Sequence, residues 1–254
     1  MEDARASERT NRAFWDADAD AYQAVHAEQF DRDLCAWGVW GVPESELRVL
    51  GDVDGRDVLE LGCGSAQWSV GLALLGARAV GLDLSIAQLG FAARRRAAHD
   101  VAVPLVLASA TSTPFVDESF DLVFCDHGAT SFCDAELVVP EIARVLRPGG
   151  RGAFNMTSRL VYWTYDASTE AQGTTLVAGA FERREWYFGD GTVDYSVSEG
   201  EWLRLFTAHG LVAVDLVELR APEGATTTFT EFAPYEFARG WPLEHIWVVE
   251  KPSS

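Results

Sequence analysis

Hydrophobic and polar positions follow two alternating patterns along most of the chain. From residue 57 onward, short apolar runs of strand length alternate with segments whose apolar positions recur at helical spacing. This order predicts a doubly wound α/β fold, in which a mostly parallel sheet is wrapped by helices, because parallel strands are joined by helical crossovers. The predicted strands are 57–61, 78–82, 104–108, 120–125 and 152–156. The predicted helices are 65–75, a segment that Ser85 opens as N-cap, and 135–146, which ends before Pro148.

Both ends of the chain depart from this alternation. Residues 1–50 predict a helical cap, with one helix over 7–30 and apolar anchors at Trp15, Tyr22, Phe30, Trp37 and Trp40. Residues 157–195 form an aromatic-rich insertion, which predicts a lid or a pocket wall because loops of this length are uncommon in compact domains. The rest of the chain predicts a hairpin turn at 188–191, a helix over 197–209 and strands over 211–219 and 245–250. We expect a single domain, 1–254, with its core at 57–156 and the rest of the sheet at 196–254.

Composition and charge narrow the class of partner. The 254 residues, 48% of them hydrophobic, are enough for one sizeable core. A net charge of -19 argues against nucleic acid and anionic membranes, which need a basic surface, and favours a small-molecule substrate. No apolar run reaches the roughly 18 residues of a membrane span, and the N-terminal stretch lacks the apolar core of a signal peptide. The four cysteines lack C-x-x-C spacing, so we expect free thiols, no metal site and a cytoplasmic protein.

A glycine turn after the first strand of the core carries the candidate chemistry. Glu60 ends an apolar run directly before Gly62 and Gly64, at the edge of a doubly wound sheet where ligands bind. Gln67 breaks the G-x-G-x-x-G pattern of dinucleotide sites, and a pyrophosphate near 4 Å from Glu60 would meet a repulsion of about 4 kcal/mol at an effective dielectric of 20. Asp83, at the end of the second strand, suits the two hydroxyls of a ribose. Two carboxylates around a glycine turn fit a nucleoside with a cationic tail, which is the shape of S-adenosylmethionine.

Four motifs in order strengthen this interpretation. They are E-L-G-C-G-S-A at 60–66, V-G-L-D-L-S at 80–85, A-T-S-T-P-F-V-D-E-S-F-D-L-V at 110–123 and R-V-L-R-P-G-G at 144–150. With them the chain resembles the class I S-adenosylmethionine-dependent methyltransferases, most closely the small-molecule group that includes quinone-biosynthesis enzymes. The resemblance covers 57–156 well and the tail more loosely. It implies a Rossmann-like seven-stranded sheet with an antiparallel last strand, S-adenosyl-L-methionine as cofactor and S-adenosyl-L-homocysteine as product.

The resemblance also implies roles for residues around the turn. Glu60 would meet the methionine amino group directly or through water, and Gly62 and Gly64 would let the backbone approach the cofactor. Asp83 would hold the ribose hydroxyls, with Leu84 against the adenine.

Five further residues complete the implied cofactor site. Gln88 would lie near the adenine, and Tyr22 would face the pocket from the N-terminal helix. Asp126 would stand beside the sulfonium at the end of strand 120–125. One position departs from the family, because Ser109 stands where an acidic residue normally contacts the adenine amine. The Ser109 hydroxyl and the Ala110 amide remain to meet the base.

The reaction itself asks little of side chains. Methyl transfer from a sulfonium is an in-line displacement that depends mainly on proximity and alignment, and a base is needed only for a protonated acceptor. His127 is the candidate base, because imidazole titrates near neutral pH, and a supporting or cofactor-contact role is the alternative. The insertion contributes aromatic residues that suggest an apolar or aromatic substrate: Tyr162, Trp163, Tyr165, Phe181, Trp186, Tyr187 and Phe188. The alternatives are a nicotinamide-dependent oxidoreductase and a protein that binds S-adenosylmethionine without transferring its methyl group.

Overall fold

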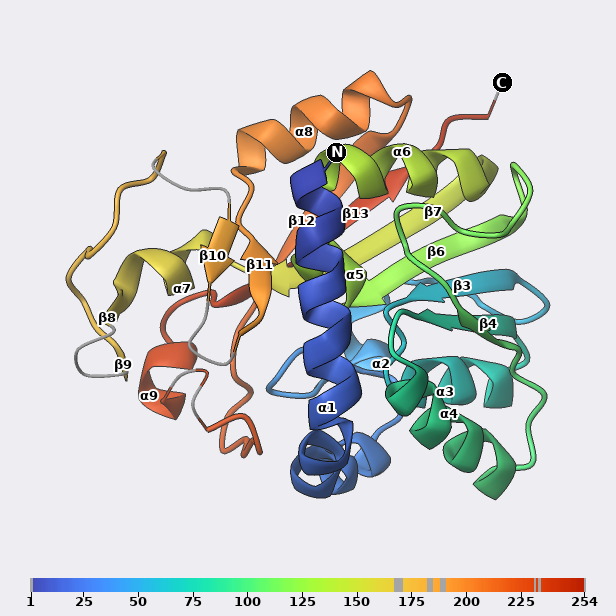
Figure 1. The fold of residues 1–254 in the computed structure, drawn as a ribbon, viewed down its shortest axis with the longest axis horizontal. Coiled ribbons are helices and arrows are strands. Elements are labelled where there is room, and N and C mark those ends of the chain that lie inside the picture. Colours follow the sequence, from blue (N-terminus) through green and yellow to red (C-terminus); the bar gives the residue numbers. More distant parts are fainter. Residues whose placement is uncertain are drawn as a thin grey trace.

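The centre of the molecule is a twisted seven-stranded sheet. A computed structural model of the chain describes residues 2–166, 171–181, 185–187, 191–230, 232 and 234–253. The sheet strands are β3 (Asp57–Leu61), β4 (Arg78–Asp83), β5 (Leu105–Leu107), β6 (Phe120–Asp126), β7 (Leu146–Thr157), β12 (Val212–Leu219) and β13 (Glu244–Glu250). Their spatial order is β12-β13-β7-β6-β3-β4-β5, and only β13 runs against its neighbours (Figure 1). The predicted doubly wound sheet with an antiparallel last strand is confirmed.

Helices cover both faces of this sheet. The main ones after the N-terminal helix are α3 (Gln67–Leu74), α4 (Ile86–Ala98), α6 (Ala135–Val145) and α8 (Glu199–Ala208). Successive strand residues point to opposite faces, so Val58 joins the apolar cluster under α3 while Leu59 joins the cluster under α6 and α8. Ser85 accepts a hydrogen bond from the Gln88 N–H, which confirms it as the N-cap of α4.

The segment after α6 differs from the prediction. We expected the strand to start at 152, but β7 begins at Leu146, directly after the helix ends at Val145. Leu146 pairs with Phe120 and Arg151 pairs with Leu122, so residues 147–150 bulge out of the ladder. A bulge is the position in a strand that tolerates a proline and glycines, which explains why this motif does not end the pairing.

The predicted N-terminal helical cap is confirmed and is longer than expected. Helix α1 (Glu2–Arg32) has 31 residues and runs across the edge toward which the parallel strands point (Figure 1). The chain then continues through β1 (Ala36–Trp37), β2 (Val42–Pro43) and α2 (Glu44–Leu47). The fully buried Trp37 packs against Trp68 with ring centroids 4.6 Å apart, which fixes this segment on the sheet.

The insertion after β7 is built from short elements. These are α7 (Arg159–Thr164), β8 (Tyr165–Asp166), β9 (Ala171–Gln172), β10 (Glu185–Tyr187) and β11 (Val193–Tyr195). Strands β10 and β11 pair antiparallel, as the predicted hairpin requires, although turn residues 188–190 lie outside the described residues, and Phe188 with them. Phe181 is 95% exposed, so it lines no pocket in this structure.

Two predicted absences concern the part of the chain that the structure describes. None of its helices is long and apolar enough to cross a membrane, and no group of His, Cys, Asp or Glu has the geometry of a metal site. All four cysteines are free thiols, with Cys63 and Cys125 buried.

Candidate functional site

The candidate site lies where the strand order of the sheet reverses. Strands β3 and β6 are neighbours in the sheet. After β3 the chain continues to β4 and β5 at one edge, and after β6 it continues to β7 toward the other edge. Ligands bind at the carboxyl ends of such strands because the connecting loops diverge there. Glu60 near the end of β3, Asp83 at the end of β4 and Asp126 at the end of β6 all lie at this edge, as the sequence predicted.

The two glycines of the turn have different reasons to be glycine. Gly62 has φ +70°, and a Cβ there would lie 2.6 Å from the Ala129 nitrogen and 2.8 Å from the Gly128 Cα. The turn therefore packs directly on the loop that precedes α5 (Ala129–Phe132). Gly64 has φ +51°, but its nearest neighbour would be the Gln88 side chain at 4.0 Å. Gly64 thus leaves open space on the side of the turn where a ligand would approach.

Glu60 is buried and acts as the cap of α3. Its Oε2 accepts hydrogen bonds from the backbone N–H and the hydroxyl of Ser69, the N–H at 2.9 Å. The N-cap residue, Ala66, has φ +57° and no side-chain acceptor. Glu60, on strand β3, therefore accepts the hydrogen bond from an N–H of the first turn of α3 that the N-cap residue leaves without a partner. Burial raises the pKa of Glu60 to about 8, against the lowering effect of the Ser69 bonds.

Asp83 clamps the glycine turn to α4. One carboxylate oxygen accepts the Gly64 N–H at 2.7 Å and the other accepts the Ser85 N–H at 2.8 Å. A carboxylate has about four lone-pair sites, so both oxygens keep acceptor capacity for hydroxyl groups. Burial raises the pKa of Asp83, with these backbone bonds opposing the rise.

Asp126 holds the segment between the N-terminal helix and the sheet. It accepts hydrogen bonds from the Trp68 indole at 3.0 Å, the Gly38 N–H at 3.1 Å and the Asn155 amide at 2.7 Å. With its oxygens engaged by three donors, its contribution to the site is negative charge. Among the described residues, neither Asp126 nor Glu60 nor Asp83 forms an ion pair with lysine or arginine.

His127 is paired with a residue that the sequence did not reveal. Its Nε2 bonds to Glu244 of β13, which is 2% exposed and also accepts the Val39 N–H at 2.9 Å. Burial alone would lower the pKa of His127, but Glu244, together with Asp126 and Asp194, raises it to about 9. The imidazole is therefore protonated at neutral pH, and only Nδ1 remains available to a substrate. Glu244 follows His127 by 117 residues, so no local pattern could link them.

Helix α1 closes over this edge of the sheet. Asp16 accepts a hydrogen bond from the Ser85 hydroxyl at 2.7 Å, and the Gln23 amide donates to the Gln88 side chain at 3.0 Å. Gln88 is therefore a buried partner of α1 rather than an exposed helical glutamine. The Ser109 hydroxyl, which also faces α1, donates to a carboxylate oxygen of Glu8 at 2.9 Å.

Tyr22 belongs to an aromatic cluster on the inner side of α1. Its ring lies 5.3 Å from Trp15 and 4.5 Å from His26. His26 in turn stacks on Phe229 at 3.9 Å with an interplanar angle of 7°. Phe232, from the same loop as Phe229, makes an edge contact with His127 at 6.1 Å. The cluster and the site are thus lined in part by one loop, which the sequence did not single out.

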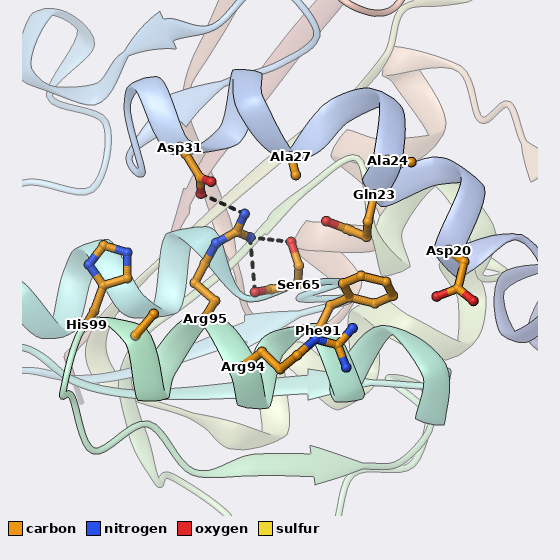
Figure 2. Close-up of a pocket in the computed structure, with 11 residues that line it drawn as sticks. Asp20, Gln23, Ala24, Ala27, Asp31, Ser65, Phe91, Arg94, Arg95 and His99 are labelled. Carbon is orange, nitrogen blue, oxygen red and sulfur yellow. Dashed lines mark hydrogen bonds and ion pairs between the residues drawn. The ribbon is translucent and has the colours of Figure 1, made fainter.

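A groove of about 450 Å³ flanks the glycine turn between α1 and α4 (Figure 2). Arg95 spans it, with Nη1 donating to the Ser65 carbonyl at 3.2 Å and Nη2 to Asp31 at 2.9 Å. Arg95 therefore ties the glycine turn to α1. Arg94 lies over the Phe91 ring at 4.1 Å on the same helix.

Comparisons with known proteins agree with this geometry. Residues 59–154 match the protein family described as a methyltransferase domain. A demethylmenaquinone methyltransferase from Mycolicibacterium paratuberculosis is 40% identical over 103 residues, which are 41% of this chain and 42% of that protein. The chain therefore matches less than half the length of such curated relatives.

Two solved structures share the fold over most of the chain. A methyltransferase from Mesorhizobium loti superposes with a TM-score of 0.62 at 22% identity and covers 84% of this chain and 99% of that one. The cyclase SpnF superposes with a TM-score of 0.68 at 17% identity and covers 98% and 97%. The chain therefore shares its fold with S-adenosylmethionine-dependent methyltransferases, and its glycine turn lies at the strand-order reversal of that fold. The match to the methyltransferase domain family over residues 59–154 agrees with the predicted resemblance.

Proposed function

We propose that the protein transfers a methyl group from S-adenosyl-L-methionine to a small apolar or aromatic molecule and releases S-adenosyl-L-homocysteine. The observation that carries this proposal is the set of three carboxyl groups around the glycine turn, of which Glu60 and Asp83 are buried and Asp126 is partly buried. No lysine or arginine among the described residues neutralises them by an ion pair. Burial raises the pKa of each of these carboxyl groups, and a cationic ligand stabilises their ionised form, so the site favours a ligand with cationic groups.

The residues present fit this cofactor. Glu60 has one carboxylate oxygen on Ser69 and one left for the amino group, and Asp83 keeps acceptor capacity for the ribose hydroxyls. Gly62 and Gly64 give the backbone close access, and Leu84 follows Asp83 at the edge where an adenine would lie. When bound, S-adenosylmethionine supplies an electrophilic methyl group on a sulfonium.

The same charges disfavour the nicotinamide alternative. A pyrophosphate on this turn would bring negative charge close to Glu60 and Asp83, neither of which pairs with a lysine or arginine among the described residues. A dinucleotide site would also require a glycine at the third position of the G-x-G-x-x-G motif, where the helix packs closely on the strand, and this chain has Gln67 there.

The acceptor would lie near His127, beside the contact that α1 makes with the loop of Phe229 and Phe232. Trp15, Tyr22 and His26 supply apolar surface on the α1 side, which suits a flat hydrophobic ring. Demethylmenaquinone, the substrate in the name of the curated relatives, is such a molecule, and we propose a quinol of this kind as the first acceptor to test.

In this proposal His127 handles the acceptor proton at Nδ1. Its Nε2 is held by Glu244, so the ring is fixed and Nδ1 is the atom left to accept a proton from the acceptor. Because the pKa of His127 is raised to about 9, only a small fraction is deprotonated at pH 7, and turnover would increase as the pH approaches 9.

The organisation we propose is one domain, with 1–50 as a cap, 57–156 as the cofactor-binding core, 157–195 as an insertion and 196–254 completing the sheet. A cytoplasmic location belongs to this proposal and is supported by the four free thiols.

The proposal is tested by turnover of the purified protein. S-Adenosylmethionine labelled in its methyl group is incubated with a reduced demethylmenaquinone analogue, a phenol or an aliphatic amine, and S-adenosylhomocysteine and labelled product are measured by mass spectrometry. We expect both products with the quinol, and much less of each with Asp83→Asn at a cofactor concentration near the wild-type Kd. Glu223→Gln, an exposed carboxylate far along the chain, is the matched control and should keep full activity. Binding of the cofactor without S-adenosylhomocysteine from any acceptor would favour a protein that does not transfer the methyl group.

A further inference from the structure

We propose that Glu8 of helix α1 completes the cofactor site by accepting a hydrogen bond from the exocyclic amine of the adenine, next to the Ala110 N–H as donor. The inference rests on the proposed function, because it concerns how the adenosyl group is recognised. It assigns a binding role to a residue 101 positions before Ser109.

The position of Glu8 follows from its contact with Ser109. The Ser109 hydroxyl donates to Glu8 Oε2 at 2.9 Å. Ser109 follows β5 at the carboxyl edge of the sheet, where the Ala108 N–H still bonds to the Asp83 carbonyl at 3.1 Å. Glu8 therefore lies at the end of β5, the strand that pairs with the Asp83 end of β4.

Ser109 is arranged to orient Glu8 rather than to bind a ligand itself. Its hydroxyl lies 2.8 Å from the Thr111 hydroxyl and accepts the Thr111 N–H at 3.1 Å, while its proton goes to Glu8. Within the described residues, the second carboxylate oxygen of Glu8 has no hydrogen bond and the side chain has no ion pair. The half-buried carboxylate thus keeps one oriented acceptor.

The two groups match one face of one base. The Watson–Crick edge of adenine carries an amine donor beside a ring-nitrogen acceptor. Glu8 offers an acceptor, and the Ala110 N–H, which bonds to no other described residue, offers the adjacent donor. Hypoxanthine has the reverse pattern, a ring N–H beside a carbonyl, and would meet acceptor with acceptor and donor with donor. The pair therefore selects adenosyl over inosyl ligands.

This arrangement also accounts for the serine at position 109. An acidic residue was expected there, and the structure brings a carboxylate to the same place from α1 instead. The helix is fixed in that position by Asp16 on Ser85 and by Gln23 on Gln88. Recognition of the base is thereby coupled to closure of α1 over the site.

The test compares two ligands on four forms of the full chain by titration calorimetry. The ligands are S-adenosylhomocysteine and its deaminated analogue, S-inosylhomocysteine. The forms are the wild type, Glu8→Gln, Ser109→Asp with Glu8→Gln, and Glu28→Gln, an exposed carboxylate on the same helix, as the matched control.

We expect the wild type and the Glu28→Gln control to prefer the adenosyl ligand at least about tenfold, the effect of one charge-assisted hydrogen bond. Glu8→Gln should lose about tenfold or more in affinity for S-adenosylhomocysteine and little for the inosyl analogue. Adding Ser109→Asp should restore the preference, because it places an acceptor at the same edge. An unchanged preference in Glu8→Gln, or an equal loss for both ligands without rescue, would overturn the inference. In either case S-adenosylhomocysteine still binds the wild type. No binding to any form would instead contradict the cofactor assignment of the proposed function, and binding without methyl transfer in the turnover assay would contradict its activity.

Discussion

Cofactor binding should depend on pH through Glu60. In the free protein this carboxyl is buried with a pKa raised to about 8, so it is mostly protonated at pH 6. An ammonium group binds the ionised form, and binding therefore releases a proton. Below the raised pKa the affinity should fall about tenfold for each pH unit, or about 100-fold from pH 7.5 to pH 5.5, equivalent to about 3 kcal/mol. Above about pH 8 Glu60 is mostly ionised in the free protein as well, and the increase should stop.

The same pKa fixes the sign of a stability effect. The folded free protein holds the Glu60 proton up to about pH 8, whereas a carboxyl in the unfolded chain loses it near 4.5. The folded state binds more protons in this window, so the contribution of Glu60 to stability falls as pH rises from 4.5 to 8. S-Adenosylhomocysteine binds more tightly at pH 7.5 than at pH 5.5 in this account, so the increase in Tm that it causes should be larger at pH 7.5.

The assay is titration calorimetry with S-adenosylhomocysteine at pH 5.5, 6.5 and 7.5, in two buffers with different ionisation enthalpies. The buffer dependence at pH 6.5 should report nearly one proton released per ligand bound. Glu60→Gln keeps an acceptor for the Ser69 N–H but has no proton to lose, so it should bind more weakly at pH 7.5 and with little pH dependence. Equal affinity at pH 5.5 and 7.5 without proton release would refute the reasoning. The same slope in Glu60→Gln would assign the titration to Asp83 or Asp126, whose pKa values are also raised by burial.

Three further changes test separate parts of the site. Asp83→Asn removes charge-assisted acceptors and should weaken S-adenosylhomocysteine binding by about 2 kcal/mol or more in calorimetry; unchanged affinity would exclude the ribose assignment. His127→Ala should lower kcat strongly with little effect on cofactor affinity, and a loss of affinity alone would make His127 a binding residue. Glu244→Gln should move the rising limb of the pH–rate profile to lower pH, because it removes the charge that raises the His127 pKa. Gly62→Ala would place a Cβ 2.6 Å from the backbone nitrogen of Ala129 and should lower the free energy of unfolding, measured in urea, by about 2–4 kcal/mol. Gly64→Ala has open space for its Cβ and should lower it by only about 1–2 kcal/mol. Equal effects of the two substitutions would contradict the packing argument.

The core of the fold was predictable because its signals are local. Strand β3 has the predicted bounds, and α4 starts at the N-cap that Ser85 announced, since apolar runs and caps depend on neighbouring residues. The placement of Glu60 and Asp83 followed for the same reason: carboxyl ends of neighbouring parallel strands meet at one edge. The early start of β7 was missed because the bulge at 147–150 depends on pairing with β6, which the sequence pattern does not contain.

The parts of the site that the sequence did not reveal come from distant segments. Glu8 reaches Ser109 across 101 residues, and Glu244 reaches His127 across 117. Each is one charged residue in a chain with 39 acidic residues, and nothing nearby distinguishes it from a solvated surface carboxylate. Glu60 was predicted as a ligand contact, but its second task, capping α3, depends on Ala66 adopting a left-handed conformation that the sequence does not indicate.

The most direct test of the central claim is a calorimetric titration of the protein at pH 7.5 with S-adenosylmethionine, S-adenosylhomocysteine and NADH side by side. The account predicts binding of the first two in the micromolar range and no binding of NADH, because a cationic group stabilises the ionised form of the buried carboxyl groups at the glycine turn and a pyrophosphate destabilises it. Binding of NADH alone would mean that the turn receives phosphates, and it would contradict the assignment of Glu60 and Asp83 and the methyl transfer that rests on them.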